Sequence, residues 1–110
     1  MDADLLAHAT EFMFLPNGAS IGDKEVFLFT VTVARRTSLW AVLWMDQCWN
    51  KKARSWDYEP RDRSQAFLQE CRFTLDDAVQ IARAMPDVLT IMDKSWLDFK
   101  AIHALQDANR

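Results

Sequence analysis

The fold of this chain turns on seven consecutive apolar residues, Leu39-Trp40-Ala41-Val42-Leu43-Trp44-Met45. Successive side chains of a β-strand point to opposite faces of its sheet, so a strand built from these residues is apolar on both faces. Such a strand belongs inside a sheet, where both faces are covered. We therefore expect a central strand over Ser38 to Trp49.

Two further strands flank this one in the sequence. Apolar residues recur at every second position between Glu25 and Arg35, which predicts a strand. The connection Arg35-Arg36-Thr37 is short enough for a hairpin, although it lacks the Asn-Gly or Asp-Gly that two-residue turns prefer. Ser55 to Glu59 alternates aromatic and acidic side chains and predicts a third strand, which Pro60 ends.

Helical spacing replaces this alternation in the second half of the chain. Apolar residues about 3.6 positions apart predict one helix over roughly Asp62 to Arg72. A second helix is predicted from Thr74, a natural N-cap, to Met85. A third should begin near Asp93 or Ser95.

The first part of the chain leaves two interpretations open. A loop rich in turn residues covers residues 16–23. The apolar residues before it follow helical spacing, and Glu11 to Leu15 also fits the end of a strand; we favour a short helix. Together the elements predict an α+β fold: one domain over residues 1–110, with an antiparallel sheet of three to four strands and two to three helices packed on one face.

The composition is that of a folded protein. Half of the 110 residues are apolar, and no apolar run approaches the roughly 20 residues that cross a bilayer. The acidic N-terminus lacks the basic start of a secretory signal. Two cysteines, Cys48 and Cys71, fit free core thiols, with a single bridge between them left open. We therefore expect a cytoplasmic protein.

The residues that are able to carry chemistry are scattered along the chain. No metal-binding spacing joins the cysteines to His8 or His103, so neither a metal nor another cofactor is expected. Two catalytic arrangements remain: Cys71 as a nucleophile with His103 as its base, or an acid–base pair of Asp57 and Glu59. Ion pairing on a solvated surface accounts for these residues more simply, so we expect no enzyme.

The net charge of −3 is unevenly distributed. Residues 35–63 carry seven basic and four acidic residues, whereas residues 74–110 carry six acidic and four basic ones. Cations interleaved with tryptophans suit single-stranded nucleic acid. However, one continuous strand would hold the Arg35 turn about 35–40 Å from the Lys51 turn. The candidate nucleic-acid residues should then form two patches rather than one groove: Arg35, Arg36, Lys51, Lys52 and Arg54.

Five tryptophans are a surplus for so small a domain. We expect Trp40, Trp44 and Trp96 in the core. Trp49 and Trp56 fit a core and a binding surface equally well, because tryptophan and tyrosine are enriched at the energetic centres of protein interfaces.

One segment combines several features in order: Trp56-Asp57-Tyr58-Glu59-Pro60, then Arg63, Phe67, Arg72-Phe73 and a helix capped at Thr74. This pattern, over roughly Leu39 to Met85, resembles that of small uncharacterised proteins of bacteriophage and prophage origin. The resemblance implies a context rather than an activity. Compact proteins from mobile elements often bind a host protein stoichiometrically and block one of its surfaces, as anti-CRISPR proteins do.

The leading hypothesis is therefore a non-enzymatic protein-binding inhibitor or modulator directed at a host defence complex. Carboxylates that imitate phosphates, together with aromatic anchors, would form its contact surface. The candidate contact residues are Trp49, Trp56, Tyr58, Asp76, Asp77, Asp87, Asp93 and Asp98. Two alternatives belong to other classes: a nucleic-acid-binding accessory protein that uses the basic turns, and a self-associating structural or assembly protein.

Overall fold

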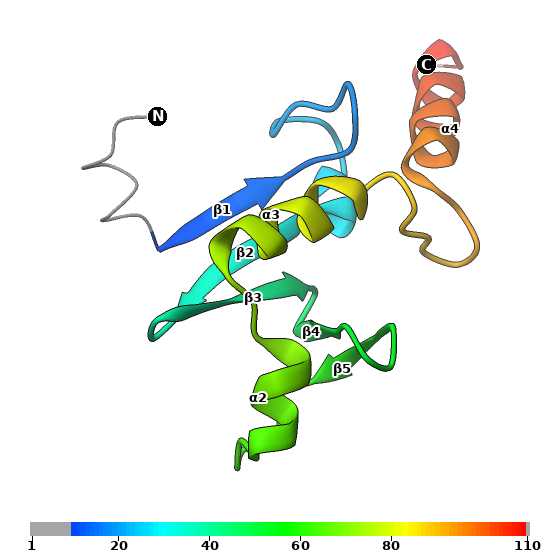
Figure 1. The fold of residues 1–110 in the computed structure, drawn as a ribbon. Helices are drawn as coiled ribbons and strands as arrows, with labels where there is room; N and C mark the ends of the chain where they lie inside the picture. The colour runs from blue at the N-terminus through cyan, green and yellow to red at the C-terminus, as the bar shows by residue number, and fades with distance from the viewer. Residues whose placement is uncertain (1–9, 110) are drawn as a thin grey trace, which may run out of the picture.

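The computed structural model describes residues 10–109 of the chain. Within this range an antiparallel sheet with the strand order β1-β2-β3-β4-β5 is followed by three helices (Figure 1). The strands are β1 (Glu11–Phe14), β2 (Val31–Arg36), β3 (Leu39–Trp44), β4 (Gln47–Asn50) and β5 (Ser55–Tyr58), and a 3₁₀ helix, η1 (Val26–Phe29), precedes β2. The helices are α2 (Gln65–Cys71), α3 (Leu75–Ala84) and α4 (Trp96–Ala108). The predicted α+β class is confirmed, with five strands in place of three to four.

The main core lies between α3 and one face of β2 and β3. Val33 and Val42 are partners across these strands, and both side chains are fully buried. They belong to one cluster with Ala78 and Ala82, which lie one turn apart on the buried face of α3. Because alanine has only a methyl side chain, this face lets the helix backbone approach the sheet closely.

The predicted central strand is in fact two strands joined by a tight turn. β3 ends at Trp44, Met45 adopts a left-handed backbone conformation with φ of 50°, and β4 starts at Gln47 and runs back along β3. The prediction of one strand over Ser38 to Trp49 is therefore wrong. Apolar residues continue into the turn and no glycine supplies the positive φ, so the pattern carries little signal of the reversal.

β3 and β4 pair only near this turn, through Leu43–Cys48 and Trp44–Gln47. Further back along β3, the N–H and C=O of Trp40 bond instead to the C=O and N–H of Phe73, at 2.8 and 2.9 Å. The amide of Lys51, just past β4, donates to the carbonyl of Glu70 at 2.9 Å. The end of α2 and the link to α3 therefore fill the opening between β3 and the end of β4.

The helices do not all pack on the face that was predicted for them. Val42 faces α3, so the next residue, Leu43, and its partner Cys48 face the opposite way. On that side Cys71 of α2 contacts Cys48. Helices α2 and α3 thus lie on opposite faces, because the Phe73 link passes through the sheet opening.

Hydroxyl side chains cap all three helices. The side chain of Ser64 accepts a hydrogen bond from the amide of Phe67 at the start of α2. In the same way, Thr74 accepts from Asp77 in α3, and Ser95 accepts from Asp98 in α4. The predicted N-cap at Thr74 and the predicted start of the last helix near Ser95 are therefore confirmed. Within residues 10–109, no helix combines the length and apolar character that a membrane span requires.

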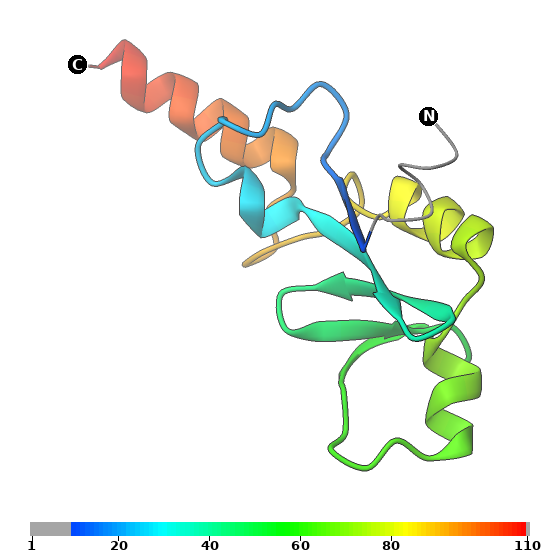
Figure 2. The same cartoon turned by 90° about the vertical axis from the view of Figure 1, so that its left-hand side faces the viewer.

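α4 projects away from the sheet, as Figure 2 shows from the side. Its first turns are anchored on η1, where the ring of Phe29 lies 5.8 Å from Trp96 and 5.0 Å from Phe99 between centroids. Further along, His103 Nε2 lies 3.4 Å from Glu25 Oε2. The rest of the helix is largely exposed.

Two predictions for the first part of the chain are wrong. Glu11 to Phe14, expected at the end of a short helix, form strand β1 beside β2; the start of that predicted helix lies outside the described residues. The strand predicted from Glu25 begins only at Val31, because residues 26–29 close a 3₁₀ turn. Thr30 Oγ1 donates to the carbonyl of Val26 at 2.9 Å and closes that turn from its C-terminal side.

The contrast between two phenylalanines of η1 tests this packing. Phe29 is completely buried and Phe27 is 70% exposed. Phe29→Ala should lower the free energy of unfolding by about 3–5 kcal/mol, because it leaves a cavity against α4. Phe27→Ala should change it by less than about 0.5 kcal/mol. Urea unfolding of the two variants measures both values, and equal losses would contradict the described core.

Candidate functional site

A groove runs between edge strand β1 and helix α3. It has a volume of about 600 Å³ and is lined by Phe12, Met13, Phe14, Leu75, Asp76, Val79, Gln80 and Arg83. We call it the β1–α3 groove. Most of its lining is apolar, while Asp76 stands near the start of α3 and Arg83 near its end. The two residues are seven positions apart, which corresponds to about 10 Å along the helix axis.

The outer edge of β1 adds backbone groups to this groove. Hydrogen-bonded and non-hydrogen-bonded pairs alternate along an antiparallel ladder. The amide of Arg35 donates to the carbonyl of Thr10 at 2.8 Å, so Phe12 and Phe14 are the next residues that bond to β2. The N–H and C=O groups of Glu11 and Met13 therefore point away from β2. No other strand within residues 10–109 pairs with this edge.

A second groove lies between the β2–β3 turn and α2. It has a volume of about 320 Å³ and is lined by Arg35, Arg36, Thr37, Leu39, Arg63, Leu68 and Arg72. We call it the arginine groove. Arg35 and Arg36 are candidate binding residues from the sequence, whereas their neighbours Arg63 and Arg72 were not predicted to lie beside them. The only sequence signal for them is that Arg63 follows Glu59 by four residues and Arg72 ends the helix after it.

Glu59 fixes two of these arginines. Its carboxylate pairs with Arg63 Nε at 3.1 Å and with Arg72, whose side chain is only 3% exposed. Burial alone would raise the pKa of Glu59, but the hydrogen bonds and charges of the two guanidinium groups outweigh it and lower the pKa below its usual value. Glu59 is therefore a structural counterion. Its neighbour Asp57 accepts a hydrogen bond from Ser55 at 2.9 Å.

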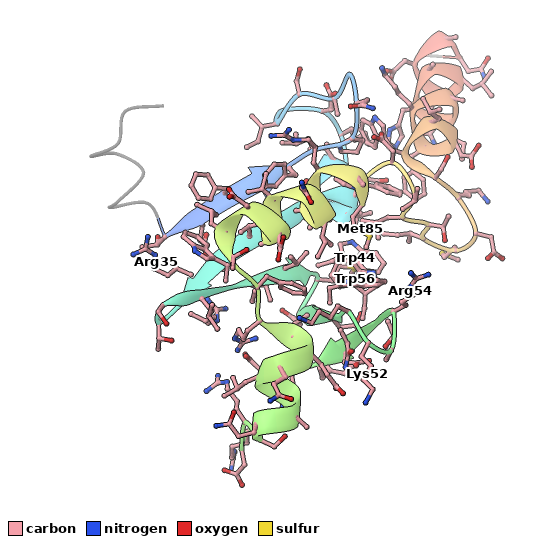
Figure 3. All side chains as sticks on the ribbon, in the orientation of Figure 1. Arg35, Trp44, Lys52, Arg54, Trp56 and Met85 are labelled. Atoms are coloured by element: carbon pink, nitrogen blue, oxygen red, sulfur yellow. The ribbon has the colours of Figure 1, made fainter. Side chains whose placement is uncertain are left out.

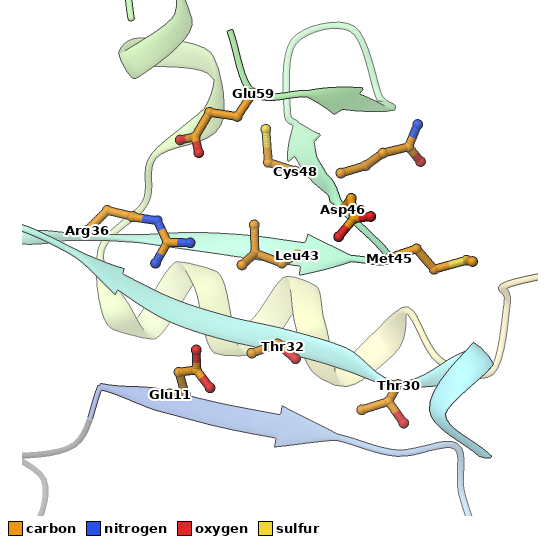
Figure 4. Close-up of a pocket in the computed structure, with 10 residues that line it drawn as sticks. Glu11, Thr30, Thr32, Arg36, Leu43, Met45, Asp46, Cys48 and Glu59 are labelled. Atoms are coloured by element: carbon orange, nitrogen blue, oxygen red, sulfur yellow. The ribbon is translucent and has the colours of Figure 1, made fainter. Parts of the chain in front are cut away.

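The sheet face opposite α3 is hollowed and carries mostly polar side chains. Figure 4 shows this hollow with α3 behind the sheet. Its volume is about 440 Å³, and its charged lining residues are Glu11, Arg36, Asp46 and Glu59. Acidic and basic groups are mixed here, so the hollow has no single charge preference. Arg36 lines both this hollow and the arginine groove.

The cysteines form a buried thiol pair. Cys48 and Cys71 are free thiols, as expected for core residues, and their side chains contact each other. Burial raises the pKa of both, that of Cys71 to about 12, so neither is a thiolate at neutral pH. His103 does not approach them, because α4 and α2 lie at opposite ends of the molecule (Figures 1 and 2). The Cys71–His103 arrangement is therefore not assembled.

The candidate aromatic anchors divide between a cluster and the surface. Trp56 lies 5.5 Å from Trp44 and 5.1 Å from Trp49 between ring centroids, and all three are partly buried against the core. Tyr58 is 73% exposed. Trp40 and Trp96 are buried as predicted. Trp49 and Trp56 are therefore half-buried members of an aromatic cluster, of which Figure 3 labels Trp44 and Trp56.

The candidate acidic residues do not gather at one place. Asp76 and Asp77 are exposed at the start of α3, about 12 Å or less along the helix from its other end. Asp87 accepts a hydrogen bond from the amide of Asn17 at 2.9 Å, and Asp98 belongs to the capping box of α4. Asp93 sits in the turn before that helix with φ of 64°. Two of these five carboxylates therefore have structural roles.

Two of the basic candidates, Arg35 and Lys51, lie closer together than the sequence predicts. Arg35 Cζ lies 4.9 Å from the ring centroid of Trp40, and Lys51 Nζ lies 5.7 Å from that of Phe73. Because Trp40 and Phe73 are bridged, the predicted gap of about 35–40 Å between the two turns is wrong. The chain reverses after Trp44 and brings β4 back toward the Arg35 turn.

The other two basic candidates lie apart from Arg35. Lys52 pairs with Glu70 at 3.7 Å, and Arg54 is exposed in the β4–β5 turn with φ of 53°. Figure 3 shows Lys52 and Arg54 on the side of the molecule away from Arg35. The basic residues therefore belong to the arginine groove on one side and the β4–β5 turn on the other.

Within residues 10–109, no group of three or more His, Cys, Asp or Glu side chains is placed to hold a metal ion. Comparisons with family models, with curated proteins and with solved structures found no match for the chain.

The role of Glu59 as counterion is testable through pH. A lowered pKa in the folded state means that its stabilisation is complete above the unfolded pKa of about 4.5 and is lost as pH falls through the folded pKa. Glu59→Gln should therefore be less stable than the parent by about 1–3 kcal/mol at pH 7, and the difference should shrink in acid.

Asp62→Asn is the control, because Asp62 is an exposed carboxylate on the same loop. It should cost less than about 0.5 kcal/mol at any pH. Urea unfolding at several pH values gives the comparison. A Glu59→Gln difference that stays constant with pH would rule out the counterion role.

Proposed function

We propose that this chain is a non-enzymatic protein-binding inhibitor or modulator that acts by stoichiometric binding. The observation that carries the proposal is the outer edge of β1, which pairs with no strand within residues 10–109 and lies beside the apolar β1–α3 groove. An extended peptide that adds to a sheet edge gains main-chain hydrogen bonds, and a neighbouring groove reads its alternate side chains. The partner is therefore an extended segment of another protein.

The groove limits the sequence of that segment. The four residues of β1 match about 14 Å of extended chain, or roughly four residues of the partner. Side chains at alternate positions point into the groove and must be apolar to fit Phe12, Phe14 and Val79. Asp76 and Arg83 favour a basic residue at one end and an acidic one at the other, about three extended residues apart.

This proposal relocates the contact surface expected from sequence. Trp49 and Trp56 are half-buried in an aromatic cluster, and the acidic candidates are dispersed, which makes them a weaker surface than a continuous groove. Of the acidic candidates, Asp76 remains part of the proposed contact. The resemblance of residues 39–85 to phage proteins supports a host protein in the cytoplasm as the partner.

A proline substitution tests the strand-addition mode directly. Met13→Pro removes an N–H that points away from β2, so it should spare the sheet and abolish partner binding. Met13→Ala removes one lining side chain but keeps the N–H, so it should weaken partner binding far less than Met13→Pro. The measurement is an affinity capture from nuclease-treated bacterial lysate with parent and variants at equal loading, quantified by mass spectrometry.

A second pair of variants tests the contribution of the apolar side chains that line the β1–α3 groove. Val79→Glu places a charge among the apolar lining residues and should release the same partner. Val88→Glu makes the identical change at an exposed valine outside the groove and should have no effect. Capture of one protein by all four variants alike would refute the proposal. Recovery of the chain alone, or of nucleic acid alone, would refute it as well and would favour self-association or nucleic-acid binding.

A further inference from the structure

The geometry points to a second binding site: the arginine groove takes the phosphate group of a small phosphorylated ligand. Four arginines are among the residues that line a space of about 320 Å³, at the lower limit of ordinary small-molecule pockets. Arginine presents a planar fork of donors that matches phosphate oxygens in pairs. This site does not use the outer edge of β1 and is independent of the proposed protein binding.

The charge of the groove is unbalanced. Glu59 neutralises part of the charge of Arg63 and Arg72, with which it is paired. Arg35 and Arg36 form no ion pair with any residue in the described range 10–109. Four positive groups thus share one carboxylate in a protein whose net charge is −3. A bound dianion would supply the missing negative charge.

The arginines are already held in place. Arg35 lies over the ring of Trp40, and Arg36 Nη1 donates to the carbonyl of Arg35 at 3.1 Å. Arg72 Nη1 donates to the carbonyl of Cys71 at 3.0 Å, and its Cζ lies 5.2 Å from the ring centroid of Phe67. Fixed side chains lose less conformational entropy when a ligand binds, which favours affinity.

The remaining lining decides between a small ligand and a nucleic-acid strand. Single-strand binders stack bases on exposed aromatic rings. Here the ring of Trp40, beneath Arg35, is only 4% exposed, and the ring of Phe67, beside Arg72, is partly buried. The other lining residues are Thr37, Leu39 and Leu68, and the two leucines suit the apolar part of a compact molecule. The acidic net charge also opposes a long polyanion. A discrete phosphate ester therefore fits better than a phosphodiester chain.

Calorimetric titration of the intact chain tests the site. The probes are inorganic phosphate, adenosine 5′-monophosphate and a single-stranded DNA 12-mer, in a phosphate-free buffer above about pH 7, where a phosphate ester carries close to two charges. Phosphate and the monophosphate should bind saturably with one site per chain. Arg36→Gln should weaken both by about tenfold or more, and Arg36→Lys should weaken them less, because lysine keeps the charge but not the fork.

Arg54→Gln is the matched control, since it removes the same charge from the distant β4–β5 turn and should leave affinity within about twofold. If Arg36→Gln fails to fold, Arg35→Gln at the exposed position beside it carries the same test. Absence of saturable binding up to about 10 mM, or equal weakening by Arg54→Gln, would overturn the site. Binding of the 12-mer without the monophosphate would replace it with a nucleic-acid surface.

Discussion

The two hydrogen bonds between Trp40 and Phe73 are the constraint on which the rest of the structure depends. They join the start of β3 to the link between α2 and α3, at the point where β4 has separated from β3. Buried backbone groups must be paired, and the N–H and C=O of Trp40 have no partner from β4 at this point. Phe73 replaces that partner, so the sheet opens without leaving buried groups unsatisfied.

Both grooves follow from this junction. On one side of the sheet, α3 starts two residues after Phe73 and is thereby held across β2 and β3, which forms the wall of the β1–α3 groove. On the other side, α2 ends two residues before Phe73, and Arg72 between them is directed at Glu59. The arginine groove then forms between α2 and the β2–β3 turn. One backbone contact therefore positions the residues of two surfaces that lie far apart in sequence.

The sequence predicted correctly those elements that are determined by residues close together in the chain. The cap at Thr74, the strand after Ser55 and the buried thiols follow from neighbouring residues, and the structure confirms them. The reversal at Met45 was missed because it needs a left-handed residue without glycine. The grooves were missed for a different reason. Arg35 and Arg72 meet only because Phe73 enters the sheet, and no periodic pattern encodes such a long-range contact.

Native-state hydrogen exchange at the amides of Trp40 and Phe73 tests this account most directly. Both amides donate across the junction, so each should exchange only through global unfolding, with an opening free energy close to that of a core amide such as Val33. Two-dimensional NMR during exchange into D₂O at several low urea concentrations gives these values. Exchange at either amide as fast as at an exposed loop residue such as Gly22 would contradict the claim that this contact organises the fold.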